Sequence, residues 1–390
     1  MPIALMRPLL SCVFLLASFT ASANQVIIPS PPQLGAKAYL LIDADTDKVL
    51  VEHNAKMLLP PASLTKMMTS YIVSEEIHAG RLKETDLVLI SDDAWRRGGT
   101  RSGSSTMFLN PRSEVPVIDL LRGVIIQSGN DASISLAQHI AGSEDAFADV
   151  MNQQAKLLGM NDSSFRNATG WPAEGHVTTA QDLAILAKAL VKDHPEHYQI
   201  YSEKYFKYNG INQPNRNKLL FLPNSYVDGI KTGHTKEAGY GLVSSAERDG
   251  MRLIAVVMGT NSEKQRANDS NKLISFGFRY YKTLSLYKPS DVIASNRVWK
   301  GVKEELNLGV QQEVVATIPR GGQKSLKAET EIDSVIEAPV KKGQVLGKIR
   351  LTLNEELVVE RDLVALEAIE GAGFFSRVFD SVVLMLGGAE

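Results

Sequence analysis

Cysteine is nearly absent from this chain. Its 390 residues include one cysteine, Cys12, which excludes an internal disulfide and a cysteine-based metal centre. The seven histidines show no H-E-x-x-H spacing, so the sequence disfavours a metal enzyme. We therefore expect no metal and no cofactor.

A strong excess of charge of one sign is also missing. The net charge is -2, whereas a nucleic-acid partner would call for a basic stripe, so we expect no nucleic acid. Charged residues make up 22% and hydrophobic residues 44% of the chain, which is ordinary for a globular protein. A length of 390 residues suggests two or three domains.

The N-terminus carries the features of a targeting segment. Arg7 precedes an apolar run through Leu16, and Ala21–Ser22–Ala23 has the small-x-small pattern of a cleavage site. We predict a signal peptide over residues 1–23. The apolar run continues past Cys12, which argues against lipidation there. The mature chain would lack cysteine and work outside the cytoplasm.

The next part of the chain predicts an α+β fold. Residues 38–55 and 238–260 read as β-hairpins, and residues 95–106 as a Gly/Ser-rich loop with three arginines. Antiparallel strands thus flank a helical middle. The helical patterns cover residues 65–78, 117–141 (two helices), 145–159 and 178–192.

The pattern changes near residue 285. Short alternating runs separated by turn residues predict a small all-β domain over residues 285–373, after a larger domain over residues 24–284. Residues 374–386 alternate apolar and polar pairs, which is typical of an amphipathic helix too short to span a bilayer. We assign residues 374–388 to this helix.

The stretch PPASLTKMM places Ser63 three residues before Lys66 at the start of a predicted helix. Ordinary residue usage gives roughly one or two S-x-x-K matches in a chain of this length, and Ser285–Lys288 is a second match. At a helix start, however, Lys66 faces Ser63 from the same side one turn later. A serine hydroxyl needs such a base to act as a nucleophile.

Two further polar motifs follow in order. Ser128–Gly129–Asn130 falls at the turn between two predicted helices, where Asn130 or Asp131 would cap the second, and Lys231–Thr232–Gly233 leads a strand. Each is weak alone, but the ordered trio is typical of serine β-lactamases and penicillin-binding proteins. Lys231 would be a second cation that, with burial, lowers the pKa of Lys66.

Each motif residue has a chemical reason to be there. Ser128 could relay a proton to the leaving nitrogen, and Asn130 could orient a substrate backbone. The Thr232 hydroxyl suits a substrate carboxylate, and the strand edge could pair with an extended peptide. The backbone N–H groups of Ser63 and His234 would form an oxyanion hole.

The chain resembles the D-alanyl-D-alanine carboxypeptidases among the low-molecular-mass penicillin-binding proteins, of the penicillin-binding protein 5 and 6 type. The resemblance covers nearly the whole mature chain, including the β domain and the terminal helix. The matching stretches are ASLTKMMT around Ser63, QSGNDA around Ser128, NRNKLL at 215–220, VDGIKTGHT at 227–235 and RLIAVVMGT at 252–260.

This resemblance implies an enzyme that removes the terminal D-alanine from peptidoglycan pentapeptide stems. Ser63 would form an acyl-enzyme with Lys66 as the base, and β-lactams would acylate Ser63 as inhibitors. The substrate carboxylate would bind Arg266 and Thr232, with Gly233 in the same substrate-binding set. The enzyme would be periplasmic and attached peripherally to the inner membrane through its terminal helix.

Alternatives stay open at this point. A serine β-lactamase would need a deacylation glutamate, and Glu174 lies in the right part of the chain without aligning to one. Two further hypotheses are a sensor that is acylated without turnover and an endopeptidase. The terminal helix lacks a basic bias, so it is either a membrane anchor, a lid on the β domain or an oligomer contact. The basic loop at 96–103 departs from the family pattern and is expected to affect access to the site.

Overall fold

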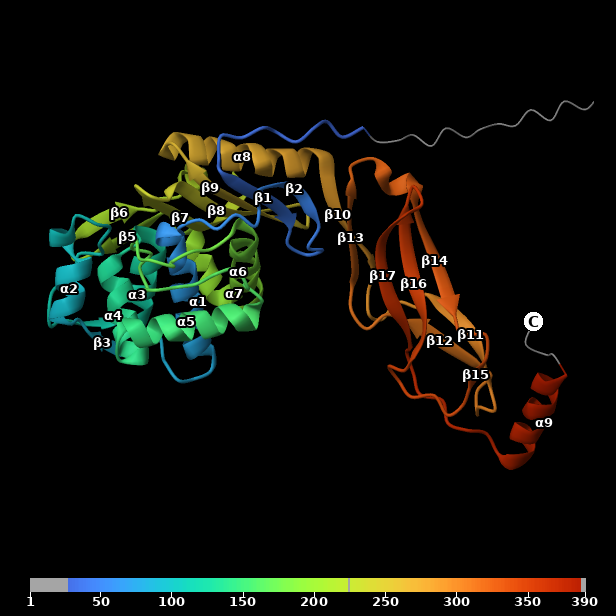
Figure 1. Cartoon of the computed structure of the whole chain (residues 1–390). Coiled ribbons are helices and arrows are strands. Elements are labelled where there is room, and N and C mark those ends of the chain that lie inside the picture. The colour runs from blue at the N-terminus through green and yellow to red at the C-terminus, as the bar shows by residue number, and fades with distance from the viewer. Residues whose placement is uncertain (1–26, 224, 387–390) are drawn as a thin grey trace, which may run out of the picture.

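The computed structural model describes residues 27–223 and 225–386, so the predicted signal peptide at 1–23 lies outside the described residues. Figure 1 shows a larger part of mixed helices and strands followed by a slender β part and a terminal helix. The expected α+β fold is confirmed. Within the described ranges, we find no helix with the length and apolar character needed to cross a membrane.

A five-stranded antiparallel sheet organises the larger part. The N-terminal hairpin lies beside the last two strands of the sheet, and both predicted hairpins are confirmed. Strand β7 lies at one edge, which leaves one of its sides free to pair with another extended chain. The spatial order is β2 (Val49–His53), β1 (Ala38–Asp43), β9 (Met251–Thr260), β8 (Gly239–Arg248) and β7 (Val227–Thr235).

Helices cover both faces of this sheet (Figure 1). Successive side chains of β1 point to opposite faces, and every one is buried. Leu40 and Ile42 join the core under the helical layer, whereas Tyr39 and Leu41 join the core under α8 (Glu263–Tyr280). Burial on both sides explains why this strand reads as a continuous apolar run.

The helical layer follows the predicted pattern except between residues 95 and 98, where helix α2 replaces the expected loop. Ser91 caps α2 by accepting a hydrogen bond from Ala94 N, and acidic residues in its first turn and arginines in its last favour the helix. The helices of this layer are α1 (Lys66–His78), α2 (Asp92–Gly98), α3 (Val117–Arg122), α4 (Asn130–Ala141), α5 (Glu144–Leu158), α6 (Ala180–Asp193) and α7 (Pro195–Tyr198).

Short elements complete the larger part. Two small strand pairs are β3 (Leu87–Leu89) with β4 (Glu114–Pro116) and β5 (Tyr205–Tyr208) with β6 (Ile211–Pro214). Single turns of 3-10 helix are η1 (Ala62–Thr65), η2 (Thr100–Ser102), η4 (Gln199–Ser202) and η5 (Lys218–Phe221), and η3 (Gly123–Gln127) is a π-helix.

The smaller part begins where α8 runs directly into β10, so the division predicted at residues 284 and 285 falls within that strand. Ser285 of the second S-x-x-K match lies on β10 and donates to Glu313. The smaller part contains one two-stranded sheet, β10 (Tyr281–Tyr287) with β13 (Val314–Pro319). It also contains a six-stranded sheet in the order β14 (Leu326–Ile332), β16 (Val345–Leu353), β17 (Glu356–Ala365), β12 (Glu305–Gly309), β11 (Ala294–Trp299) and β15 (Ile336–Glu337). One 3-10 turn, η6 (Gly322–Ser325), precedes β14.

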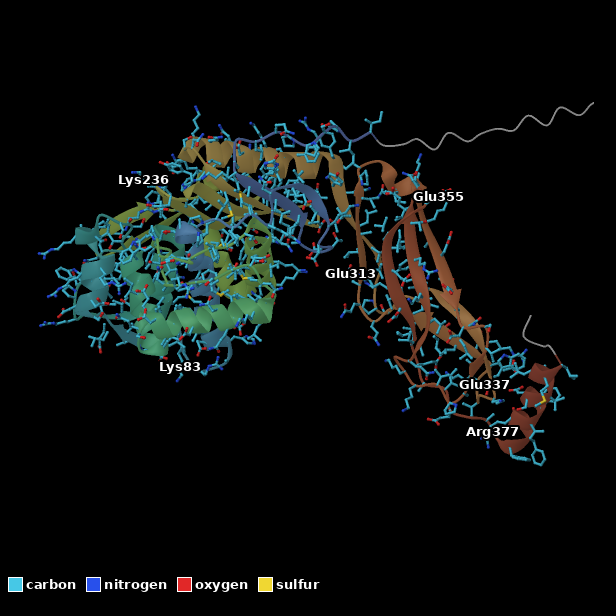
Figure 2. All side chains as sticks on the ribbon, in the orientation of Figure 1. Lys83, Lys236, Glu313, Glu337, Glu355 and Arg377 are labelled. Atoms are coloured by element: carbon cyan, nitrogen blue, oxygen red, sulfur yellow. The ribbon has the colours of Figure 1, made fainter. Side chains whose placement is uncertain are left out.

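The terminal helix α9 (Phe374–Met385) matches the predicted amphipathic segment. None of its residues is buried, so it is not a lid on the β core. One contact to the rest of the chain is the Lys300 N–H, which donates to Asp380 Oδ2 at 2.6 Å. In Figure 2, Arg377 on α9 and Lys236, just beyond the end of β7, lie at opposite ends of the molecule.

Candidate active site

Ser63 and Lys66 lie where η1 passes into α1. The Lys66 side chain is fully buried, and its Nζ donates to Ser63 Oγ at 3.2 Å, to Asn130 Oδ1 at 2.6 Å and to the Thr169 carbonyl at 2.6 Å. A 3-10 turn that leads into an α-helix therefore brings the Ser63 and Lys66 side chains of the S-x-x-K motif together. This arrangement places an amine within hydrogen-bond reach of the serine hydroxyl.

The surroundings of Lys66 favour its neutral form. Burial lowers the pKa of Lys66 from 10.5 to about 7, and the positive charge of Arg216 is the next cause. The sequence predicts Lys231 as that second cation, whereas the structure gives this part to Arg216. Burial also holds the pKa of Lys231 well below its usual range, and the charge of Lys66 contributes to this shift. Two buried amines thus share a site that disfavours two positive charges.

Ser128 and Asn130 reach the two lysines from the turn after η3. Ser128 adopts a left-handed backbone with φ of 59°, and its Oγ accepts a hydrogen bond from Lys231 Nζ at 2.9 Å. Asn130 accepts from Lys66 and donates through Nδ2 to Ser104 Oγ at 2.9 Å. The turn therefore links both lysines of the predicted site.

Asp131 has a different role from the predicted helix cap. Gly129 is the N-cap of α4, and no side chain caps it. The buried Asp131 carboxylate instead accepts hydrogen bonds from the backbone N–H groups of Met107 and Leu109 and from the Thr106 hydroxyl. It thereby fixes the segment after Ser104, which contacts Asn130.

Gly233 lets strand β7 approach the nucleophile turn closely. A Cβ atom at this position would lie 3.0 Å from both the Pro61 carbonyl oxygen and Leu64 Cγ. Lys231 and Thr232 are buried within the strand, which begins at Val227 and so includes the motif in its interior. A side chain at Gly233 would push the strand away from the turn that holds the serine.

A cavity of about 230 Å³ opens between these elements. Both Arg216 and Arg266 line it, and burial lowers the pKa of each guanidinium. Arg266 donates to the Gly233 carbonyl at 3.2 Å, and the His234 ring stacks on Tyr240 with a centroid separation of 3.9 Å. Two guanidinium groups suit a carboxylate ligand. The lining residues are Ser63, Ser105, Ser128, Arg216, Thr232, Gly233, His234, Tyr240, Glu263 and Arg266.

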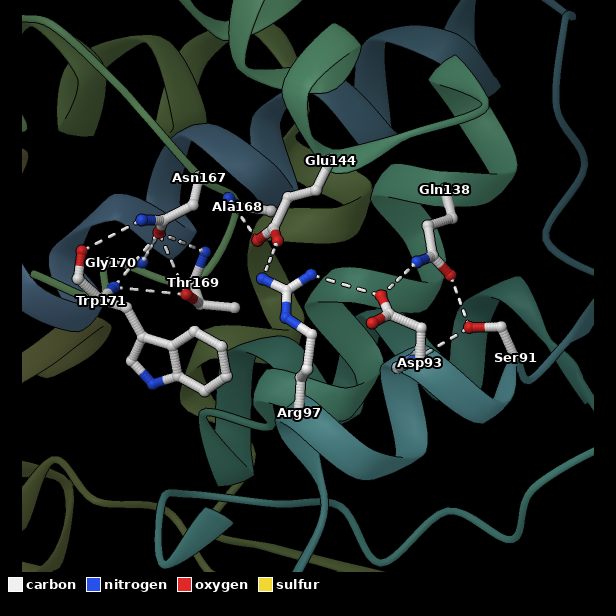
Figure 3. Close-up of polar contacts among 11 residues, drawn as sticks. Ser91, Asp93, Arg97, Gln138, Glu144, Asn167, Ala168, Thr169, Gly170 and Trp171 are labelled. Carbon is white, nitrogen blue, oxygen red and sulfur yellow. Dashed lines mark hydrogen bonds and ion pairs between the residues drawn. The ribbon is translucent and has the colours of Figure 1, made fainter. Parts of the chain in front are cut away.

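The Thr169 carbonyl that contacts Lys66 belongs to a tightly bonded turn (Figure 3). Asn167 Oδ1 accepts hydrogen bonds from the N–H groups of Thr169, Gly170 and Trp171. Gly170 has a φ of +86°, a backbone conformation that favours glycine. This side-chain-stabilised turn fixes one of the three acceptors around the Lys66 amine.

Glu144 connects this turn to α2. Its carboxylate accepts from Ala168 N at 3.1 Å and from Arg97 Nη2 at 2.7 Å (Figure 3). The Arg97 guanidinium also lies 5.6 Å from the ring centroid of Trp171. At least one arginine of the basic stretch at 96–103 therefore helps to hold the loop beside Lys66, although its side chain remains partly exposed.

A family profile described as D-alanyl-D-alanine carboxypeptidase matches residues 25–262. The chain belongs to the D-alanyl-D-alanine carboxypeptidase family. A second profile, described as the penicillin-binding protein 5 C-terminal domain, matches residues 281–371.

Relatives of this carboxypeptidase family agree over most of the chain. The chain is 46% identical over 374 residues to D-alanyl-D-alanine carboxypeptidase DacC of Escherichia coli, covering 95% of this chain and 93% of that protein. The structure of penicillin-binding protein 5 from Haemophilus influenzae superposes with a TM-score of 0.83 at 40% identity, covering 88% of this chain and 99% of that one. An ampicillin-bound penicillin-binding protein D2 from Listeria monocytogenes has a TM-score of 0.58 at 30% identity, covering 64% of this chain and 100% of that one.

The resemblance noted from the motifs is thus confirmed, and the protein is a serine-type D-Ala-D-Ala carboxypeptidase. All nine predicted site residues lie around one cavity or in the hydrogen-bonded group beside it: Ser63, Lys66, Ser128, Asn130, Lys231, Thr232, Gly233, His234 and Arg266. Three residues near the site were missed. Arg216 lies in the quoted NRNKLL stretch, whereas Thr169 and Glu144 carry no motif signal.

Proposed function

We propose that Ser63 is the nucleophile of this carboxypeptidase and that Lys66 is its base. The observation that carries this proposal is a buried amine 3.2 Å from Ser63 Oγ with a pKa lowered to about 7. Neutral Nζ takes the hydroxyl proton as Oγ attacks the carbonyl carbon of the penultimate D-alanine. Ser128, hydrogen-bonded to Lys231, passes a proton to the leaving nitrogen as the C–N bond breaks.

The substrate is the pentapeptide stem of peptidoglycan. Its terminal carboxylate would bind Arg266, Arg216 and the Thr232 hydroxyl in the cavity beside Ser63. The extended stem would add to the free edge of β7, with Asn130 oriented toward its backbone. Water then hydrolyses the ester, which frees Ser63 and the shortened stem.

β-Lactams are the expected covalent inhibitors. Like the pentapeptide stem, a β-lactam has a carbonyl that Ser63 can attack and a carboxylate that the arginines can bind. The ampicillin-bound relative supports this inference by similarity.

The acylation site can be tested by mass spectrometry. Wild-type protein treated with penicillin should carry one adduct on the Ser63 peptide, and it should release D-alanine from a pentapeptide. Ser63→Ala should abolish both, whereas Ser285→Ala, from the second S-x-x-K match, should change neither. An adduct without any release of D-alanine would favour a sensor that is acylated without turnover. An adduct on another peptide would refute Ser63 as the nucleophile.

We also propose that residues 1–23 direct export, that residues 24–284 and 285–373 are the catalytic and β-rich domains, and that residues 374–388 attach the periplasmic enzyme to the inner membrane. Support comes from α9, where Phe375 and Met385 are each 87% exposed and Phe379 is 69% exposed. An exposed apolar helix face is suited to the interface of a bilayer.

Sedimentation with lipid vesicles tests the attachment. Phe375→Glu with Phe379→Glu should leave the mature chain in the supernatant, while wild type sediments with the vesicles. Leu157→Glu is a matched control, because Leu157 is 81% exposed on α5. Equal binding of wild type and the α9 double variant would contradict membrane docking.

A further inference from the structure

A second polar cluster lies at the opposite end of α1 from Lys66. It consists of His78, in the last turn of α1, His194, between α6 and α7, and Glu196, in the first turn of α7. The helix length separates it from Lys66 by about 18 Å. One nitrogen or oxygen atom from each of the three side chains lies within 4.8 Å of the others. None of these residues has a part in the proposed catalytic steps.

His194 presents a buried lone pair to this cluster. Its side chain is 1% exposed, and its Nε2 lies 2.7 Å from Glu75 Oε1. A carboxylate accepts from an N–H group, so Nε2 carries the proton of the neutral ring and Nδ1 carries the lone pair. That Nδ1 atom is buried and has no hydrogen-bond partner among the residues that the structure describes. A carboxylate that orients an imidazole in this way is a common feature of metal-binding histidines.

The ligand atoms of the three side chains are spaced nearly as they would be around one shared metal ion. His194 Nδ1 lies 3.9 Å from Glu196 Oε1, which is too long for a hydrogen bond. Two ligand atoms on one tetrahedral zinc ion lie roughly 3.3 Å apart. The Glu196 side chain is 54% exposed, so a small rotation would close the difference. The rings of His78 and His194 lie with centroids 5.8 Å apart at 65°.

The surrounding charge is negative. Glu75 and Glu196 face His194. Asp193 accepts a hydrogen bond from the hydroxyl of Tyr71 at 2.8 Å, and the Tyr71 ring lies 5.1 Å from the His194 ring. His197 repeats the arrangement, with Nε2 3.2 Å from Glu84 and a buried Nδ1 3.9 Å from the same Glu196 oxygen. Carboxylates around imidazole nitrogens favour a bound cation.

We propose that His78, His194 and Glu196 bind one divalent transition-metal ion, for which Zn²⁺ is the best fit, with water as the fourth ligand. Two imidazoles and a carboxylate are donors that zinc accepts in tetrahedral geometry. The ion would link the C-terminal end of α1 to the α6–α7 turn. Its effect is therefore on the stability of the larger part and not on the reaction at Ser63.

This site departs from the expectation of no metal. That expectation rested on the absence of H-E-x-x-H and of cysteine ligands. The proposed ligands lie 116 and 118 positions apart from His78 and converge only when α1 packs beside α6.

Zinc titration of the untagged mature protein tests the proposal. After treatment with a chelator and its removal, calorimetry with ZnCl₂ should give one ion per chain, and zinc should raise the thermal midpoint. Co²⁺ in place of Zn²⁺ should give the visible absorption bands of a tetrahedral site. His78→Gln and Glu196→Gln change exposed side chains and should each weaken zinc binding by at least about 10-fold.

His139→Gln is the matched control, because His139 is an exposed histidine on α4 away from the cluster. It should bind zinc as wild type does, and so should protein acylated by penicillin. The proposal is overturned if stripped wild-type protein binds no stoichiometric zinc, or if His78→Gln and Glu196→Gln bind it unchanged. Zinc binding that penicillin abolishes would place the ion at the active site and overturn it equally.

Discussion

The two parts of the molecule handle charge in opposite ways. The larger part buries Lys66, Lys231 and Arg266, each with defined hydrogen-bond acceptors. Among the described residues from 281 to 371, Thr317 is the one buried polar side chain, and the ion pairs lie on the surface. Glu360, for example, is partly exposed and pairs with Lys348 and Arg350 at the surface.

The difference arises because the larger part holds the active site, whereas the β part is built around apolar cores. Burying an ammonium or guanidinium group costs free energy unless partners compensate, and such groups concentrate where chemistry needs a shifted pKa. The β part avoids this cost by keeping its cores apolar. Substitutions of the same kind should therefore have very different effects in the two parts.

Removing the buried base should have the largest effect. Lys66→Ala should lower the rate of acylation by about 10³-fold, because general-base catalysis contributes 10²–10⁴-fold. Labelled penicillin and rapid mixing give this rate directly. Lys288→Ala removes the lysine of the second S-x-x-K match and should react as wild type does. A Lys66→Ala protein that folds and acylates within a few fold of wild type would show that another base acts.

The pH dependence of acylation should report the shifted lysine. A pKa of about 7 for Lys66 means that the amine is mostly neutral above pH 7 and mostly protonated below it. The acylation rate should therefore reach a plateau above neutral pH and fall about 10-fold per unit below it. A base with an ordinary lysine pKa would instead give a rate that still rises between pH 8 and pH 10. Initial rates across pH 5 to 10 distinguish the two.

Arg216 should affect both binding and this pH profile. Arg216→Ala removes one of the two guanidinium groups that line the cavity and a positive charge that lowers the pKa of Lys66. We expect KM for the pentapeptide to rise about 10-fold and the acylation profile to move to higher pH. Arg350→Ala, in the β part, should change neither. A raised KM with an unmoved profile would limit Arg216 to carboxylate binding.

Much of this fold follows from periodicity in the sequence. The turns at Asp45–Thr46–Asp47 and at Asp249–Gly250 predict the two hairpins because turn signals are local. The three motifs point to the site for a similar reason, since Ser63 and Lys66 are neighbours on one turn. Helix α2 was missed because the glycines and serines that follow it obscured the cap at Ser91.

Other parts of the site depend on contacts between distant residues. Thr169 contributes a main-chain carbonyl to Lys66, so its side chain gives no signal in the sequence. Glu144 acts through Ala168 and Arg97, which only the packing of α2 and α5 brings together. Isolated polar residues of this kind cannot be told from surface residues without the tertiary fold.

The sharpest comparison applies one substitution to each part. Glu144→Gln removes the charge of a buried carboxylate that accepts hydrogen bonds from Ala168 N and Arg97. It should destabilise the larger part by about 1–3 kcal/mol. Glu360→Gln should leave the midpoint of unfolding unchanged at neutral pH. Although hydrogen bonds from Lys348 and Arg350 lower the pKa of Glu360 to about 2, its side chain is partly exposed on the surface and water screens its ion pairs. Thermal unfolding of both variants at pH 7 measures the difference. An equal loss of stability in the two would mean that surface pairs support the β part as buried ones support the site.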